Sequence, residues 1–230
     1  MKICIIGAGA IGGLLAARLA KNGEDVTIVA RGAQLAAIRD KGLRLIEESG
    51  EMITVAPRAV ERPEGVVNQD LIVLAMKAHQ VCAVAAAAPK MLAPEGLLLT
   101  AQNGIPWWYF FHHGGEHEGR TLESVDPGGE IARQLPVDRV IGSVVYPAAE
   151  IAEPGVIRHI EGNRFSLAAI DNSKSERIRA VSAAFTAADF KAPVVTDIRA
   201  EIWTKLWGNL SFNPISALTG ATLASICRNP

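Results

Sequence analysis

Short apolar runs alternate with longer amphipathic stretches along the first hundred residues. The run Lys2–Ile6 ends in glycine and is typical of a buried parallel strand, and Ile11–Lys21 predicts a helix closed by Asn22-Gly23. The same alternation predicts four more strands and two more helices: strands Asp25–Ala30, Leu43–Ile46, Asp70–Ala75 and Gly96–Ala101, and helices Ala33–Lys41, ended by Gly42, and His79–Leu92. Strands that alternate with helices imply right-handed crossovers and a doubly wound α/β sheet.

The pattern changes after Asn103-Gly104. Residues 105–130 are rich in aromatic side chains, histidine and glycine, and they predict no regular element. Beyond them we expect strands Arg139–Pro147, Val156–Ile160, Phe165–Ala169 and Val194–Thr196, a turn at Glu153-Pro154-Gly155, and helices Ser173–Phe190, Asp197 to Asn213 with Asp197 as its cap, and Ile215–Arg228. The chain therefore predicts a Rossmann-like domain over residues 1–196 and the start of an all-helical domain over residues 197–230.

Composition narrows the classes of protein to consider. The chain has 230 residues, a net charge of −1 and no basic run, which argues against nucleic acid or an acidic membrane surface as the main partner. Its longest apolar stretches, such as Val81–Ala88, are shorter than the roughly 20 residues of a membrane span. The chain begins directly with a strand, which leaves no room for a signal peptide. We expect a cytoplasmic protein.

Cysteine and histidine do not form a metal site in the sequence. Cys4, Cys82 and Cys227 are scattered, so we expect each to be a small buried apolar residue rather than part of a disulfide framework. Three histidines and two glutamates gather in a glycine-rich stretch, where a solvated loop is favoured over a metal site: His112, His113, Glu116, His117 and Glu118. The aromatic run 107–110 fits a lid, a subunit contact or core packing.

A GxGxxG pattern joins the first strand to the first helix: Gly7-Ala8-Gly9-Ala10-Ile11-Gly12. The first glycine permits a tight turn, the second lets the backbone approach a pyrophosphate, and the third lets helix and strand pack closely. The N-terminus of the helix supplies N–H donors and the positive end of its dipole. The pattern is weak evidence by itself, but here it opens a complete βαβ unit and predicts a dinucleotide site.

The end of the second strand indicates which dinucleotide is bound. NAD enzymes place Asp or Glu there to hold the ribose 2′-hydroxyl, whereas this chain reads Val29-Ala30-Arg31. A guanidinium suits a 2′-phosphate because it forms two parallel charge-assisted hydrogen bonds. A solvated surface charge is the alternative for Arg31. We expect the cofactor to be NADP(H).

Lys205, Asn209 and Asn213 recur at every fourth position of a largely apolar helical stretch. Each step of four residues turns about 40° past a full circle, so the three side chains share one stripe. An exposed face would favour Glu and Lys pairs over two amides. Ketone reduction needs a hydride donor, an acid for the developing alkoxide and donors for the substrate, and lysine and asparagine can supply the last two.

These motifs, in this order, resemble those of ketopantoate reductases over essentially the whole chain. The pieces are Gly7–Gly12, Lys77, Asn103-Gly104 and the most specific one, Arg199 to Pro214. The resemblance implies NADPH-dependent reduction of 2-dehydropantoate to pantoate, in pantothenate biosynthesis. It implies these roles: Lys205 as general acid, Asn103, Asn209 and Asn213 as substrate contacts, Lys77 and Asn103 near the nicotinamide, and the backbone of Ala148 lining the cofactor.

The chain departs from the family in two ways. Family members continue past the position of Pro230 through helices that carry a serine and a glutamate of the active site, so we expect the rest of the helical domain to be missing. The segment 105–130 is longer and more aromatic than its counterparts, and it lies near the expected substrate entrance. Two alternatives stay open: the same chemistry on another branched or bulky 2-keto acid, and a non-catalytic NADP(H)-binding or redox-sensing protein. The apolar face of the C-terminal helices would pack on the missing helices or on a second subunit in a homodimer.

Overall fold

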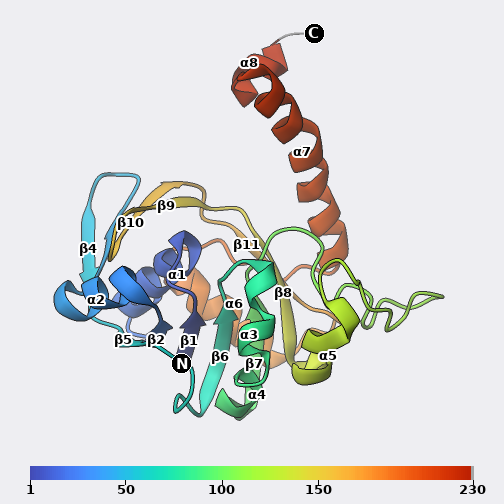
Figure 1. Cartoon of the computed structure of the whole chain (residues 1–230), viewed down its shortest axis with the longest axis horizontal. Coiled ribbons are helices and arrows are strands. Elements are labelled where there is room, and N and C mark those ends of the chain that lie inside the picture. Colours follow the sequence, from blue (N-terminus) through green and yellow to red (C-terminus); the bar gives the residue numbers. More distant parts are fainter. Residues whose placement is uncertain (229–230) are drawn as a thin grey trace.

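A seven-stranded sheet forms the centre of the protein in the computed structural model, which describes residues 1–228 (Figure 1). Asn229 and Pro230, where we expected the chain to stop within a domain, lie outside the described residues. The strand order is β11-β8-β7-β6-β1-β2-β5, and only β11 runs antiparallel to its neighbour. The strands are β1 (Lys2–Ile6), β2 (Asp25–Val29), β5 (Arg58–Val60), β6 (Gln69–Leu74), β7 (Leu92–Thr100), β8 (Val140–Val145) and β11 (Phe165–Ala169).

Two apolar clusters cover the two faces of this sheet. Strand β1 contributes to both, because Ile3 and Ile5 face one cluster while Cys4 and Ile6 face the other. Helices α1 (Ala10–Lys21), α2 (Gly32–Lys41) and α6 (Glu176–Ala187) pack on the first face. Short helices α3 (Cys82–Ala85), α4 (Ala88–Met91) and α5 (Glu130–Gln134) pack on the second. The predicted doubly wound, Rossmann-type sheet is confirmed.

A second sheet of four strands lies over α1, in the order β4-β3-β10-β9. Its strands are β3 (Leu43–Ile46), β4 (Met52–Val55), β9 (Ala148–Glu153) and β10 (Val156–Glu161). The bounds predicted for β3 are confirmed, but its expected place in the main sheet is wrong, since it pairs with β10. The sequence did not reveal β4, β5 and β9. Strand β9 is a largely exposed edge strand whose Ala149 packs against the first apolar cluster.

Two other predicted elements are wrong. The expected helix His79–Leu92 is a 3₁₀ turn, η1 (Ala78–Gln80), followed by the single-turn helices α3 and α4, and Leu92 already begins β7. Pro89 explains the break between α3 and α4, because it has no N–H to donate to the carbonyl of Ala85, the last residue of α3, and it occupies the first turn of α4 instead. The expected strand Val194–Thr196 is only an isolated bridge between Leu167 and Val194.

Helix α7 (Ile198–Thr219) begins in the second apolar cluster and then extends away from the sheet, ending near α8 (Leu223–Arg228) (Figure 1). Asp197 caps it as predicted and accepts hydrogen bonds from the backbone N–H groups of Arg199 and Ala200. The predicted break at Pro214 is wrong, since α7 continues through it to Thr219. Proline removes the hydrogen bond to the carbonyl four residues earlier, that of Leu210, and this residue is exposed. The domain boundary at residue 197 stays a prediction.

No helix within residues 1–228 is both long enough and apolar enough to cross a membrane. The cysteines differ from one another, contrary to expectation: Cys4 is buried in the sheet, whereas Cys82 and Cys227 are exposed. Burial raises the pKa of the Cys4 thiol to about 12, so it is an unreactive core residue.

Candidate active site

The turn between β1 and α1 contains two glycines that no other residue can replace without a shift. Gly7 has φ +113°, a conformation that side chains disfavour, and its N–H donates to the Val29 carbonyl over 3.2 Å. A Cβ on Gly12 would lie 1.9 Å from the carbonyl oxygen of Gly7. Gly9, the second glycine of the pattern, is different, because a Cβ there would meet no atom of residues 1–228 within 4 Å. Gly9 therefore faces open space at the start of α1.

That open space has the chemistry of an anion site. Gly9 is the N-cap of α1, and no described side chain caps this end of the helix. The backbone N–H groups of the first turn thus point outward at the positive end of the dipole. Gln34, from α2, donates to the Ala8 carbonyl over 3.0 Å and so fixes the turn from the side. The residues present fit the pyrophosphate of a dinucleotide.

Other predicted cofactor residues follow neighbouring strands of the same sheet. Arg31 comes just after β2 and is exposed, without an ion pair to any residue from 1 to 228. Lys77 follows β6 and is also exposed, and Asn103 follows β7. The carboxyl ends of parallel strands meet at one edge of a sheet, where open α/β sheets bind their ligands. Ala148 begins β9 and is half-buried.

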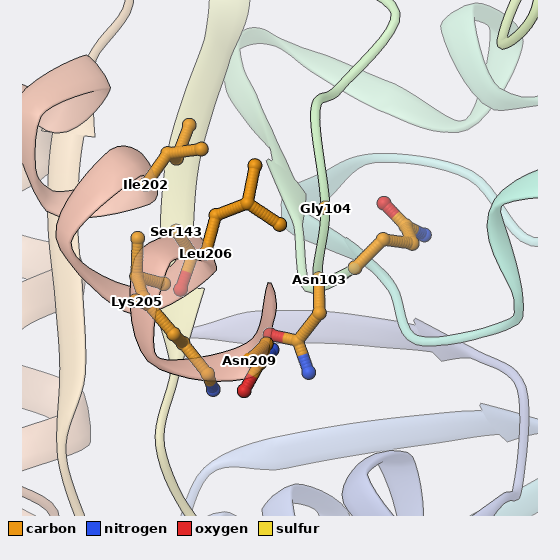
Figure 2. A pocket seen from close by; sticks show the side chains of 9 residues that line it. Asn103, Gly104, Ser143, Ile202, Lys205, Leu206 and Asn209 are labelled. Carbon is orange, nitrogen blue, oxygen red and sulfur yellow. The ribbon is translucent and has the colours of Figure 1, made fainter. Parts of the chain in front are cut away.

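A small cavity of about 20 Å³ lies between α7 and the ends of β7 and β8 (Figure 2). Figure 2 shows the side chains of Lys205 and Asn209 coming from α7, while that of Asn103 approaches from the loop after β7. Asn213 does not belong to the described lining of this cavity. The lining consists of Gln102, Asn103, Gly104, Ser143, Val144, Ile202, Lys205, Leu206 and Asn209. The structure therefore brings together three of the four predicted catalytic residues.

Lys205 is half-buried against the end of β8. Its ammonium group donates a hydrogen bond to the Val145 carbonyl, and Nζ lies 4.9 Å from the centroid of the Tyr146 ring. Burial lowers the pKa of the Lys205 ammonium from its ordinary value of 10.5, because the charged form is partly desolvated. A lysine with a lowered pKa is a better proton donor near neutral pH.

The sequence did not point to several lining residues. Gln102 precedes Asn103 and donates to the Leu74 carbonyl over 2.7 Å, which ties the loop after β7 to β6. Ile202 and Leu206 are the apolar neighbours of Lys205 on the helix, and helical spacing was the available signal for them. Ser143 and Val144 lie on β8, where nothing in a buried apolar run distinguished them from core residues.

The aromatic segment packs beside the start of α7. Trp107 and Trp108 are buried in the second apolar cluster, which supports core packing for these two. The ring of Phe110 makes edge contacts with His113 and His117, both exposed or half-exposed. Within residues 1–228, no group of three or more His, Cys, Asp or Glu side chains is arranged to hold a metal ion.

Comparison with known proteins gives a consistent family. The model of "Ketopantoate reductase PanE/ApbA" matches residues 3–172. A 2-dehydropantoate 2-reductase from Mesorhizobium japonicum is 54% identical over 228 residues, which are 98% of this chain and 69% of that protein. A 2-dehydropantoate 2-reductase from Pyrococcus abyssi is 30% identical over 95% of this chain and 64% of its own length.

Solved structures agree with the fold. A putative ketopantoate reductase from Ralstonia solanacearum superposes with a TM-score of 0.89 at 42% identity, over 96% of this chain and 68% of that one. D-mandelate dehydrogenase in a ternary structure with NADH and anilino(oxo)acetate gives a TM-score of 0.76 at 20% identity, over 94% of this chain and 63% of that one. The second likeness shows a shared fold alone.

Proposed function

The chain belongs to the ketopantoate reductase PanE/ApbA family, and from this we propose that it reduces 2-dehydropantoate to pantoate with NADPH. The reaction is a step of pantothenate biosynthesis. The observation that carries the proposal is the convergence of Lys205, Asn209 and Asn103 on one cavity. That cavity lies at the carboxyl ends of the parallel strands, the same edge that holds the glycine turn.

Lys205 is the proposed general acid. When bound, NADPH supplies a hydride to the keto carbon, and the ammonium of Lys205 gives a proton to the keto oxygen, which leaves a 2-hydroxy acid and NADP⁺. An ammonium carries three N–H donors. One is directed to the Val145 carbonyl, so two are available for the substrate and the orientation of the group is fixed.

Asn103 and Asn209 are the proposed substrate contacts. Their amides donate and accept hydrogen bonds without adding charge, so they hold a carboxylate or a hydroxyl without changing the charge around Lys205. Asn213 lies two helical turns beyond Lys205. Its role as a substrate contact therefore rests on the family motif alone.

The proposed cofactor contacts divide by chemistry. The residues Gly7 to Gly12 and the first turn of α1 would hold the pyrophosphate, and Arg31 would pair with the 2′-phosphate that distinguishes NADPH from NADH. Lys77, Asn103 and the backbone of Ala148 are proposed to lie along the nicotinamide half. Lys77 donates its backbone N–H to the Gln80 side-chain carbonyl over 3.2 Å, and its own side chain is exposed.

The direct test is to follow NADPH oxidation with 2-dehydropantoate and related 2-keto acids, with NADH as a comparison. In the Lys205→Ala variant we expect kcat to fall at least about 100-fold, the usual contribution of a general acid. Lys174→Ala is the matched control, since Lys174 is an exposed lysine before α6. Full turnover by Lys205→Ala would overturn the proposed mechanism.

A second candidate keeps the chemistry and changes the substrate to a bulkier 2-keto acid. It is motivated by the aromatic segment, which contacts the helix that carries Lys205: the Trp203 indole N–H donates to the Tyr109 hydroxyl over 2.7 Å, although neither residue belongs to the described cavity lining. Turnover of an aromatic or branched keto acid in preference to 2-dehydropantoate would select it. Tight NADPH binding without oxidation by any keto acid would instead indicate a non-catalytic NADP(H)-binding protein.

The cytoplasm is the proposed location, and the three free cysteines support it, because thiols persist in a reducing compartment. The proposed partner is a small-molecule 2-keto acid. The homodimer stays a prediction.

A further inference from the structure

Three hydrogen-bond donors converge on the carboxylate of Glu201, one turn before Lys205 on α7. Ser166 on β11 donates its hydroxyl over 2.8 Å, and Arg164 donates from Nη2 over 3.3 Å. The third donor is the Tyr146 hydroxyl, at 3.2 Å. A carboxylate that accepts from three donors on other elements fixes α7 against the ends of β8 and β11. None of the roles proposed above uses this cluster.

Tyr146 connects this cluster to Lys205. Its hydroxyl is held by Glu201, while the face of its ring lies 4.9 Å from the Lys205 Nζ. The residue before it, Val145, supplies the carbonyl that accepts from the same ammonium. A cation within about 6 Å of an aromatic centroid is attracted by the ring quadrupole. One short stretch of chain therefore contacts the ammonium on two sides.

We propose that Tyr146 and Glu201 are positioning residues for Lys205. The Glu201 carboxylate holds the Tyr146 ring in place, and the ring, with the Val145 carbonyl, keeps the ammonium charged and directed towards the substrate. This inference rests on the proposed role of Lys205 as general acid. It gives a role to Tyr146, which lies outside the family motifs, and to Glu201, which lies within the motif Arg199 to Pro214 but had no role assigned there.

The charges around the ring support this arrangement. From α7, Glu201 faces the hydroxyl; from the stretch before β11, the Arg164 guanidinium lies 5.7 Å from the ring centroid. Arg164 is itself paired with Glu201, which offsets its repulsion of the ammonium. Burial, followed by the charge and the hydrogen bond of Glu201, raises the pKa of the Tyr146 phenol from its ordinary value of 10.0, so it is a neutral donor near neutral pH.

Burial and the Tyr146 ring act on the pKa of Lys205 in opposite directions. Burial alone lowers the pKa of the ammonium, and a ring that attracts the cation opposes this. Removing the ring should lower the pKa of Lys205 further. Because a general acid must be protonated, the high-pH limb of the kcat profile should then move to lower pH.

The test compares Tyr146→Leu, which removes the ring, with Tyr146→Phe, which removes only the hydroxyl. Glu201→Leu releases the hydroxyl from the opposite side. Glu150→Gln is the control, since Glu150 forms an exposed ion pair with Arg158 in the second sheet. Each protein is labelled with ¹³C at the lysine Cε, and the Lys205 signal is assigned by its loss in Lys205→Ala. Its titration is followed by NMR beside the pH profile of kcat.

In Tyr146→Leu we expect a lower Lys205 pKa and a fall in kcat of about tenfold, with the KM for NADPH unchanged. Glu201→Leu should move the titration in the same direction, Tyr146→Phe by less, and Glu150→Gln not at all. A wild-type Lys205 titration in Tyr146→Leu would overturn the proposal. Tyr146 is 37% exposed, so the site tolerates substitution, and Tyr146→Met is a second ring-free variant of similar length.

The two proposals fail in distinguishable ways. If Lys205→Ala retained turnover, the role of Lys205 as general acid would be wrong, while the NMR titration would still report whether Tyr146 and Glu201 control its charge. If Lys205→Ala lost turnover but the titration did not respond to Tyr146 or Glu201, only the positioning inference would be wrong.

Discussion

At the scale of single residues, the glycines of the first turn divide into those required by the protein and one left free for a ligand. Gly12 has no room for a Cβ because the carbonyl oxygen of Gly7 would lie 1.9 Å away, whereas Gly9 has open space and φ −75°, which any residue can adopt. The same sequence motif thus contains a requirement of folding and a requirement of binding.

These two requirements can be separated by a matched pair of alanine variants. In Gly9→Ala we expect unchanged thermal stability but NADPH binding weakened about tenfold or more, since the new methyl group occupies the approach of the pyrophosphate. In Gly12→Ala we expect a lower melting temperature, because the backbone must shift. Thermal unfolding and titration of NADPH fluorescence measure the two effects. Equal loss of stability in both variants would contradict this division.

At the residue scale, the sequence predicted those site residues that lie at regular spacing on one helix. Lys205 and Asn209 share a helical stripe and both line the cavity, whereas Asn213 continues the stripe beyond the point where α7 leaves the sheet. Tyr146 and Glu201 were not predictable, because their contacts join α7 to the ends of β8 and β11 across 35 to 55 residues of chain.

At the scale of elements, the sequence predicted correctly those features that depend on a few neighbouring residues, such as the ends of helices. The N-terminal cap of α7 and the C-terminal cap of α1 were readable because each depends on a few neighbouring residues. The membership of β3 in the second sheet was not, since its alternating pattern suits either sheet and one of its two partners, β10, follows more than a hundred residues later. The break at Pro89 was visible but outweighed by the alanines around it.

One element-scale prediction concerns how α7 holds the aromatic segment. The Arg199 guanidinium, in the first turn of α7, donates to the carbonyls of Tyr109, Phe111 and Ile170 over 2.9, 2.6 and 2.9 Å. Arg199→Met would leave three carbonyls without donors, and we expect a loss of about 3 kcal/mol of unfolding free energy at roughly 1 kcal/mol for each bond.

The loss should be concentrated in the segment that Arg199 holds. Hydrogen exchange of peptides covering residues 105–120 should accelerate more than that of peptides covering β1, because the turns there lose their anchor to α7. Arg179→Met is a suitable control, since Arg179 forms an exposed pair with Glu176 within α6. Uniform acceleration across the chain would show that Arg199 supports the whole core rather than this segment.

At the scale of the whole molecule, a buried ionic cluster joins the second sheet to α1. Arg18 on α1 pairs with Glu47, next to β3, and its Nη2 lies 3.1 Å from the Nδ1 of buried His159 on β10. Arg18 also donates to the Asp189 carbonyl, near the end of α6. The glycine turn lies at the N-terminus of α1 and Arg18 lies in its last turn, so this cluster fixes the opposite end of the helix that carries the cofactor site.

The cluster predicts how stability depends on pH. Burial raises the pKa of Glu47, but the hydrogen bond and charge of Arg18, together with His159, outweigh it and leave the pKa below its ordinary value of 4.5. A carboxyl whose pKa is lowered by folding contributes stability that is present above 4.5 and is lost as the pH falls through the lowered value. In Glu47→Gln the guanidinium of Arg18 loses its charged partner, so we expect a loss of about 3 kcal/mol at pH 7.

Urea unfolding of wild type and Glu47→Gln at a series of pH values measures this. The two stabilities should converge as the pH falls from 4.5 through the lowered pKa of Glu47, because wild-type Glu47 becomes protonated in the folded protein over that range and then resembles the amide. Glu150→Gln, which breaks an exposed pair in the same sheet, should cost at most about 1 kcal/mol at pH 7. A constant difference between wild type and Glu47→Gln at every pH would mean that the difference does not come from the charge of Glu47, and it would contradict the proposed ionic link between the second sheet and α1.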